Sequence, residues 1–338
     1  MNVEPSTKVT IAIPTFNRAR YLKEAIDSAL SQTWPHIEVL ISDNASTDST
    51  RAYLATLDDP RIRVILQAEN IGMMANWNAC LAAATGKYFL MLSDDDLIEP
   101  TAVAELLGRF EESARYGMTG TAEEIGMVYC HARIIDERGE QTALAKGAPA
   151  WEPAAAAIDA FFACNRHTFP CTILLRTADA ASLGGYDAPA YPLIADAQMW
   201  MKVALKRGMV GHIGATLSSY RQHRVSTTKT VRIQAWMDDN VALAAFCAAQ
   251  LEQRGDARLA AAILSQADWY NAVAAAALLD DSAAPGISRA WQYLKLSRNF
   301  LAASTARVVA VSAVKLLLSR NLKSRIKRTL GATHTEAQ

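Results

Sequence analysis

Cysteine is scarce in this sequence, and its few copies are scattered. The five cysteines form no CxxC pair and show no spacing of the kind that zinc sites use. The sequence therefore predicts neither a disulfide framework nor a zinc site, and we expect small buried side chains in a reducing compartment. The five are Cys80, Cys130, Cys164, Cys171 and Cys247.

Long apolar runs are missing as well. No uninterrupted apolar stretch reaches the roughly 18 residues that an ordinary transmembrane helix needs. The first residues, Met1 to Pro5, lack the basic and apolar regions of a signal peptide. We therefore expect a cytoplasmic protein without a membrane-spanning segment.

Acidic residues are absent from one long segment near the end of the sequence. Between residues 282 and 335 there is no Asp or Glu, whereas ten Lys or Arg occur. Because the formal net charge of the chain is zero, the remainder carries an acidic excess of about ten charges. A basic segment of this length indicates an anionic surface as its partner.

The sequence otherwise has a globular composition. Its 338 residues are 51% hydrophobic and 20% charged, which suits one large domain with an appendage, or two domains. Short apolar runs alternate with stretches of helical spacing, and this rhythm predicts an α/β fold with a mostly parallel central sheet. From about Val231 the composition shifts to alanine-rich helix.

Strands are predicted at 9–13, 37–41, 62–66, 88–92, 126–130 and 172–175, and helices at 20–32, 49–57, 76–84, 100–110 and 194–206. We expect Pro14 to end the first strand, because proline cannot donate to a sheet ladder. The polar residues that follow each strand would then share one rim of the sheet.

Three carboxylates follow the most apolar of these runs. Residues 88–92 lead through Ser93 into Asp94, Asp95 and Asp96, which would lie at the carboxyl end of a buried strand. Adjacent carboxylates repel unless a cation joins them, and clustered oxygens suit Mg²⁺ or Mn²⁺ together with a substrate phosphate. The alternative is a charged turn after a buried strand.

Five groups of motifs occur in a fixed order along the chain. They are Pro14-Thr15-Phe16-Asn17-Arg18; Ser42-Asp43-Asn44-Ala45-Ser46-Thr47-Asp48; Asn70-Ile71-Gly72 with Gly86-Lys87-Tyr88, Ser93-Asp94-Asp95-Asp96 and Pro100; Gly184-Gly185-Tyr186-Asp187 with Ala195-Asp196 and Trp200; and Tyr220-Arg221-Gln222-His223. Together they resemble the family 2 glycosyltransferases of the GT-A fold, over roughly residues 8–228. The resemblance implies a Rossmann-like, nucleotide-sugar-binding catalytic domain over 1–228. A helical, alanine-rich and basic region over 229–338 would follow it.

The resemblance also implies roles for single residues. Asp43 would bind the base or ribose of the donor, and the donor pocket would be lined by Pro14, Thr15, Asn17 and Asn70. In the carboxylate motif, which looks like the DxD motif of the family, the usual first aspartate falls on Ser93. Asp95 would be the direct ligand of a Mn²⁺ or Mg²⁺ ion, together with Asp96 and His223. Asp94 would make a ribose or water-mediated contact.

Asp196 matches the catalytic base of the family. The implied enzyme is an inverting hexosyltransferase that moves a sugar from a UDP- or dTDP-sugar to a glycan or lipid-linked acceptor, in bacterial surface-polysaccharide synthesis. The donor sugar, the acceptor and the linkage stay open.

Several of these residues also have a structural interpretation. Asp43 and Asp196 are suited to capping the helices that follow them, and Asn70 with Gly72 suits a simple turn. His223 suits a polar surface loop. Trp200 and Cys171 are expected to be packing residues rather than parts of an acceptor platform.

Two other functions compete with this hypothesis. A nucleotidyltransferase also pairs a Rossmann-like sheet with metal-binding aspartates, but it would need a Gly-rich, Arg-bearing loop after the first strand. A binding module that has lost catalysis would retain the fold alone, and the joint presence of Asp43, Asp95 and Asp196 argues against it.

The basic segment contains a candidate amphipathic helix over 303–330. Its apolar residues recur at three- and four-residue spacing, while most basic residues fall on the other side, with Lys315 and Arg325 near the stripe. The apolar stripe is Val311, Val314, Leu318, Leu322 and Ile326. Such a helix predicts either peripheral membrane contact with anionic lipid or packing on the catalytic domain or on a second subunit, as in a homo-oligomer.

Overall fold

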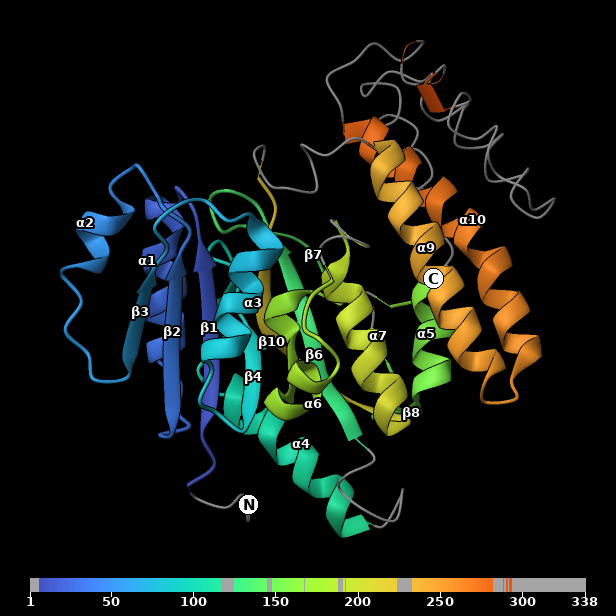
Figure 1. The fold of residues 1–338 in the computed structure, drawn as a ribbon, viewed down its shortest axis with the longest axis horizontal. Helices are drawn as coiled ribbons and strands as arrows, with labels where there is room; N and C mark the ends of the chain where they lie inside the picture. Colours follow the sequence, from blue (N-terminus) through green and yellow to red (C-terminus); the bar gives the residue numbers. More distant parts are fainter. Residues whose placement is uncertain are drawn as a thin grey trace, which may run out of the picture. The chain divides into compact units, whose positions relative to one another are not determined.

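A computed structural model gives the fold (Figure 1). The structure describes residues 6–116, 125–144, 148–166, 168–187, 191, 193–223, 233–281, 288, 290, 292 and 293. The chain divides into two compact units, Met1–Ser226 and Thr227–Gln338. The assignment of residues 1–228 as a catalytic domain stays a prediction, and the candidate amphipathic helix at 303–330 lies outside the described residues.

The first unit begins with the expected alternation of strands and helices. Its first elements are β1 (Val9–Thr15), α1 (Ala19–Leu30), β2 (Ile37–Asp43), α2 (Thr50–Leu54), β3 (Ile62–Leu66), α3 (Met73–Ala83), β4 (Tyr88–Met91), β5 (Leu97–Ile98) and α4 (Ala102–Tyr116). The next are β6 (Ile125–Ile135), β7 (Gln141–Leu144), β8 (Trp151–Pro153), α5 (Ala154–Phe162), β9 (Ile173–Arg176), α6 (Thr177–Ser182), α7 (Ala195–Arg207) and β10 (Met209–Arg221).

These strands form one sheet in the order β3-β2-β1-β4-β9-β6-β10-β5, with β7 beside β6 and β8 beside β10. Parallel pairing joins β3, β2, β1 and β4 to one another, and joins β6 to β10. Because β9 runs antiparallel to both β4 and β6, all six of these strands point the same way. The predicted GT-A-like, mostly parallel sheet is confirmed.

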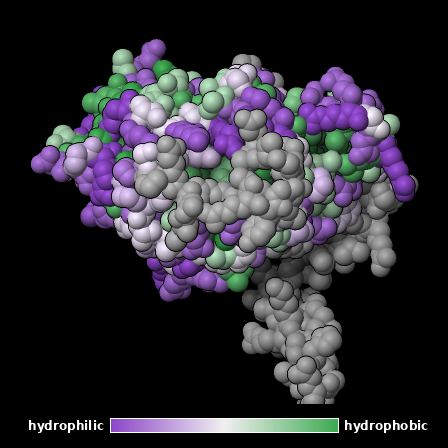
Figure 2. Space-filling model, turned by 90° about the horizontal axis from the view of Figure 1, so that it is seen from below, coloured by the Kyte–Doolittle hydropathy of each residue, from purple (hydrophilic) through white to green (hydrophobic). Residues whose placement is uncertain are grey.

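The core lies on both faces of this sheet. Every residue of β1, β2 and β4 is buried, as continuous apolar runs in parallel strands predict. Helices α1 and α4 pack on one face, and α3, α6 and α7 lie on the other (Figure 1). On the surface shown in Figure 2, hydrophilic and hydrophobic residues are interspersed.

Some predicted boundaries were wrong, and Pro14 shows why. The first strand continues through Pro14 to Thr15 instead of ending there. The backbone of Ala12 faces β4, where its carbonyl accepts a hydrogen bond from Leu92, so alternation turns Pro14 to the same side. Registered pairing with β4 ends at Ala12, so the missing N–H of Pro14 breaks no ladder bond.

Other differences from the predicted boundaries are small. β2 extends to Asp43 because its last two residues still pair with β1 and β3. α2 has only five residues, α3 begins three residues earlier than expected at Met73, and α4 continues to Tyr116. The strand predicted at 126–130 is the start of the longer β6, whereas β3 has the predicted bounds.

The second unit contains two helices in its described part, α9 (Ile233–Glu252) and α10 (Ala257–Asp281). Gly255 lies between them with a φ of 85°, and Asp256 accepts a hydrogen bond from the backbone N–H of Leu259.

 This φ lies in the left-handed region that glycine adopts readily. The expected alanine-rich helices are therefore present. No helix in the described part of the chain combines the length and the apolar character that a membrane span needs.

Candidate active site

The carboxyl ends of β1, β2, β4 and β10 meet at one rim of the sheet. Thr15 ends β1, Asp43 ends β2, the three aspartates follow β4, and His223 lies two residues beyond β10. Open α/β sheets bind ligands at this edge. The structure therefore brings together, at one edge, predicted site residues that are up to about 200 positions apart in the sequence.

The three carboxylates have three different environments. Asp94 Oδ2 accepts a hydrogen bond from Thr15 Oγ1 at 2.7 Å, and Asp96 Oδ1 accepts one from the backbone N–H of Arg221 at 2.8 Å. Burial, followed by the charge of Asp95, raises the pKa of Asp94 to about 7 and raises the pKa of Asp96 well above its usual range. Asp95, by contrast, contacts the side chains of Arg18 and His223.

Asp95 lies between an arginine and a histidine. Its Oδ2 atom is 3.1 Å from Arg18 Nη1 and 2.8 Å from His223 Nε2. The His223 ring is stacked on Tyr21 with 5.2 Å between ring centroids, and its side chain is buried. His223 is therefore a buried neighbour of Asp95, and not the surface histidine of the alternative interpretation.

The chemistry of this pair fits a divalent cation. A carboxylate oxygen and an imidazole nitrogen are ligands that Mn²⁺ accepts, and 2.8 Å is close to the spacing of two neighbouring ligand atoms around one ion. Asp96 is fully buried and is engaged with the backbone of Arg221. Among the described residues, no three His, Cys, Asp or Glu side chains are arranged to hold an ion. Divalent ions of this kind usually share their coordination shell with water and substrate phosphates.

The loop after β2 is organised around Asp43. This carboxylate is fully buried, and its Oδ2 accepts a hydrogen bond from Arg51 Nε at 2.6 Å while both oxygens lie within reach of the Ser46 N–H. The helix-capping alternative is wrong for Asp43, because α2 begins at Thr50, whose N–H donates to Asp48. The donor-binding role of Asp43 stays a prediction.

Asn17 ties the loop after β1 to the loop after β2. Its Oδ1 accepts hydrogen bonds from the backbone N–H groups of Thr47 and Asp48, and its own N–H donates to Ser46 Oγ. Asn17 has a φ of 54°, which asparagine tolerates better than most residues. The adjacent Pro14 and Thr15 are buried in β1, so of these three residues only Asn17 is exposed.

Asn70 has a structural role in the turn before α3. Its Oδ1 accepts hydrogen bonds from Asn44 Nδ2 and from the backbone N–H of Gly72. Asn44 in turn accepts one from the backbone N–H of Ile71. Asn70 therefore links the turn to the loop after β2, as the turn interpretation requires, and its contact with a donor stays a prediction.

Asp196 lies in the first turn of α7. Its Oδ1 accepts a hydrogen bond from the Ala197 N–H at 2.8 Å, and the N-cap of the helix is Ile194 rather than Asp196. Burial raises the pKa of Asp196 to about 6, which leaves it mostly ionised at neutral pH. A carboxylate with such a pKa is suited to accepting a proton.

The turn before α7 is clamped to α3. Asn78 Oδ1 accepts a hydrogen bond from the Tyr186 N–H, and Asn78 Nδ2 donates to the Tyr186 carbonyl, each at 2.8 Å. Gly185 has a φ of 71°, and a Cβ there would collide with Asn78 Oδ1. The glycine is therefore required both by its conformation and by the close approach of Asn78.

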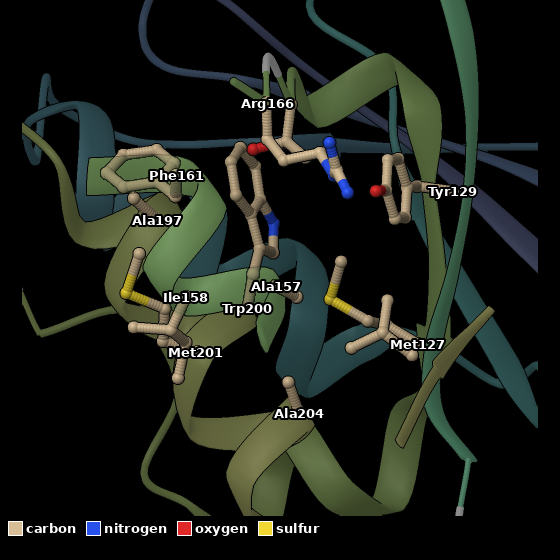
Figure 3. Close-up of a pocket in the computed structure, with 12 residues that line it drawn as sticks. Met127, Tyr129, Ala157, Ile158, Phe161, Arg166, Ala197, Trp200, Met201 and Ala204 are labelled. Atoms are coloured by element: carbon tan, nitrogen blue, oxygen red, sulfur yellow. The ribbon is translucent and has the colours of Figure 1, made fainter. Parts of the chain in front are cut away.

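An apolar cavity lies next to α7, the helix that carries Asp196 (Figure 3). It lies between the sheet and the helices α5 and α7, and Ala197, the residue after Asp196, contributes to its wall. Most of its lining is apolar: Met127, Ala157, Ile158, Phe161, Ala197, Trp200, Met201, Ala204 and Val210, with Tyr129, Arg166 and Thr168. Arg166 is paired with Glu152 at 3.0 Å, so the cavity presents little net charge.

Trp200 is buried, as expected for a packing residue, and it also lines this cavity. Cys171 is fully buried next to Asp96, and burial raises the pKa of its thiol well above the usual range. None of the five cysteines, all of which are described, is part of a disulfide. Neither of these two side chains changes the assignment of the site.

Sequence reasoning gave no role to two arginines at the rim. Arg18 contacts Asp95, and Arg221 donates through Nε to the Asp95 carbonyl and through Nη2 to Glu24. Both stand inside motifs that were identified from the sequence. A basic residue within a motif that is expected to bind a diphosphate was the signal that could have found them.

Comparisons with known proteins agree with this geometry. Residues 10–134 match the family model described as "Glycosyl transferase family 2". A putative glycosyltransferase, EpsE, from Bacillus subtilis is 34% identical over 157 residues, which are 44% of this chain and 55% of the relative. The succinoglycan biosynthesis protein ExoO from Rhizobium meliloti is 35% identical over 101 residues, 30% of this chain and 29% of the relative.

Solved structures show the same fold. The S. aureus TarS 1–349 structure in complex with UDP-GlcNAc has a TM-score of 0.60 at 14% identity and covers 90% of each chain. The fold is that of the GT-A-like glycosyltransferase structures. Residues 10–134 of the chain are similar to glycosyl transferase family 2, and the chain spans about half the length of the Bacillus subtilis relative.

Proposed function

We propose that this protein is an inverting, metal-dependent glycosyltransferase that uses a UDP- or dTDP-sugar and a glycan or lipid-linked acceptor. The observation that carries the proposal is the contact of Asp95 with His223 at the carboxyl end of β4, on the same rim as Asp43 and Asn17. The UDP-GlcNAc bound to the structural neighbour TarS supports a nucleotide sugar as donor.

In this proposal Asp95 and His223 hold Mn²⁺ or Mg²⁺, and the donor diphosphate completes the coordination shell. When bound, the ion acts as a Lewis acid that stabilises the departing diphosphate. Asp43 and Asn17 hold the loops against which the nucleoside binds, through the hydrogen bonds to Ser46 and Thr47. Asp94 makes a ribose or water-mediated contact.

Asp196 is the proposed base. Ionised above a pKa of about 6, it takes the proton of the acceptor hydroxyl while the oxygen attacks the anomeric carbon. The new C–O bond forms on the face opposite the diphosphate, whose bond to the sugar breaks with the electron pair going to the phosphate oxygen. One displacement inverts the anomeric configuration.

The acceptor is proposed to approach from the side of α7. The apolar cavity that begins at Ala197 would hold an uncharged, apolar part of the acceptor, such as a lipid or an aromatic group, because its lining offers few hydrogen bonds. The name of the Rhizobium meliloti relative, a succinoglycan biosynthesis protein, supports polysaccharide synthesis as the setting.

The candidate amphipathic helix at 303–330, within the basic segment, is proposed to contact anionic lipid. Full-length protein should sediment with anionic liposomes at low salt, whereas a chain that ends at Leu301 should not, although it should still bind its donor. Failure of the full-length protein to sediment, or unfolding of the first unit in the shortened chain, would instead favour a helix that packs on protein or joins a homo-oligomer.

The decisive experiment is a screen of nucleotide sugars by thermal shift, with and without Mn²⁺, followed by an assay of the product. A bound donor raises the unfolding temperature by mass action. A glycosyltransferase releases nucleoside diphosphate from its donor with Mn²⁺. Release of pyrophosphate would indicate a nucleotidyltransferase, and binding without turnover would indicate a non-catalytic module.

A further inference from the structure

Arg18 occupies the position next to both proposed ligands of the metal. Its Nη1 atom is 3.1 Å from Asp95 Oδ2 and 2.7 Å from His223 Nε2, and these two atoms are themselves 2.8 Å apart. The three atoms form a compact triangle. The Arg18 guanidinium therefore occupies the place that a divalent ion bound to both Asp95 and His223 would take.

This arrangement has a simple physical reason. A carboxylate oxygen and the lone pair of a neutral imidazole nitrogen repel each other at 2.8 Å unless a donor or a cation satisfies both. The guanidinium of Arg18 can donate to both atoms. A divalent ion would satisfy both as well, but it cannot share this space with a guanidinium of the same sign.

The second arginine at the rim, Arg221, is more deeply buried than Arg18. Arg221 is buried, donates to Glu24 at 2.6 Å and to the Asp95 carbonyl at 2.9 Å, and packs over the ring of Tyr21. The Arg18 side chain is 21% exposed and begins in the loop that precedes α1. Of the two, Arg18 therefore has the greater access to solvent, because the Arg221 side chain is only 2% exposed.

We propose that Arg18 is an exchangeable internal cation: it holds Asp95 and His223 in the metal-free protein, yields them to the divalent ion, and moves onto the donor diphosphate. This inference rests on the proposed function. A metal ion alone must displace Arg18 without giving it a new partner. The diphosphate offers the guanidinium a two-point contact, so metal and nucleotide should strengthen each other's binding.

The test is Mn²⁺ binding to the full chain, measured by electron paramagnetic resonance of the free ion, with and without UDP or dTDP. In the wild type, nucleotide should increase the Mn²⁺ affinity by on the order of tenfold. In Arg18→Gln, Mn²⁺ alone should bind more tightly by on the order of tenfold, and the gain from nucleotide should shrink. Lys23→Gln removes the same charge from exposed α1 and should behave like the wild type.

The outcomes separate this inference from the proposed function. If Arg18→Gln binds Mn²⁺ no more tightly than the wild type and Lys23→Gln, the exchange is wrong, although a metal-dependent enzyme stands. If the wild type binds no Mn²⁺ even with nucleotide, both are wrong. Should Arg18→Gln fail to fold, Arg18→Lys supplies the comparison, because its ammonium lacks the planar fork and should give an intermediate Mn²⁺ affinity.

Discussion

The two halves of the first unit are built differently. In the N-terminal half, residues 6–98, polar side chains tie the rim loops to one another, as Asn17 does with Thr47 and Asp48, and Asn70 with Gly72. In the C-terminal half, residues 125–223, a largely apolar cavity has Ala197, the residue after Asp196, in its wall. A ligand that is the same in all relatives can be bound by loops that hydrogen bonds hold in place. The residues of an apolar wall, in contrast, can be substituted one at a time.

The extent of the family match follows the same division. The family model covers residues 10–134, which include nearly all of the N-terminal half but only β6, up to residue 134, of the C-terminal half. Under the proposed function, the N-terminal half binds most of the donor, with His223 as the contribution of the other half to the metal site, and the C-terminal half binds the acceptor. Substitutions in each half should therefore change different kinetic constants.

The largest effect is expected from Asp95→Asn. Loss of the charge removes the proposed metal ligand, so transfer and the metal-dependent part of donor binding should almost disappear. Release of nucleoside diphosphate with Mn²⁺ measures this, with Asp27→Asn on exposed α1 as control. Full activity of the variant, or of the wild type in EDTA, would contradict the metal assignment.

Asp196→Asn should lower turnover by on the order of 100-fold or more while leaving donor affinity unchanged, because the amide cannot take the acceptor proton. Since burial raises the pKa of Asp196 to about 6, the wild-type rate should fall as the pH drops below 6, where the carboxyl becomes protonated. That acid limb should be absent from the residual activity of the variant. Unchanged turnover would show that another group takes the proton.

Asn17→Ala tests the loop ties of the N-terminal half. Two backbone N–H groups lose their acceptor, so the free energy of unfolding should fall by about 1 kcal/mol, measured by urea denaturation. The KM for the donor should rise while the KM for the acceptor stays constant. A change confined to the acceptor would reverse the assignment of the two halves.

The smallest effect is expected from Ala157→Phe, which fills the cavity from α5. The KM for an acceptor with an apolar group should rise several-fold, with donor hydrolysis unchanged, because only the space for the acceptor is reduced. Ala156→Phe, on the exposed side of the same helix, is the matched control. If Ala157→Phe only raises the stability, the cavity is a packing defect and does not bind the acceptor.

Much of the N-terminal half could be predicted from the sequence, because its strands are short apolar runs and its loops are motifs. β3 has its predicted bounds, and Asp94 to Asp96 follow a buried parallel strand as expected. β10 was harder to predict, since glycines and serines interrupt its apolar pattern and its pairing with β6 shifts register. The antiparallel direction of β9 depends on distant partners that no local pattern contains.

The residues of the candidate site could be named from the sequence, whereas their contacts could not. The order of the motifs identified Asp95, Asp196 and His223 as candidates. The spacing of residues predicts neither the pairing of Arg18 with Asp95 nor that of Arg51 with Asp43. A basic partner favours the ionised form of a carboxylate that is partly or fully withdrawn from water, and which basic side chain pairs with it depends on what the fold places nearby.

The antiparallel strand β9 has a consequence for how such proteins diversify. It pairs with β4 over three residues and with β6 over three, and it lies between the strand that leads to the carboxylates and the strands of the other half. Because β9 pairs with each neighbouring strand over only three residues, it is a suitable point at which to recombine relatives. Under the proposed function, exchanging α7, which follows β9, between relatives while keeping His223 should give chimeras that retain their donor and change part of the acceptor site.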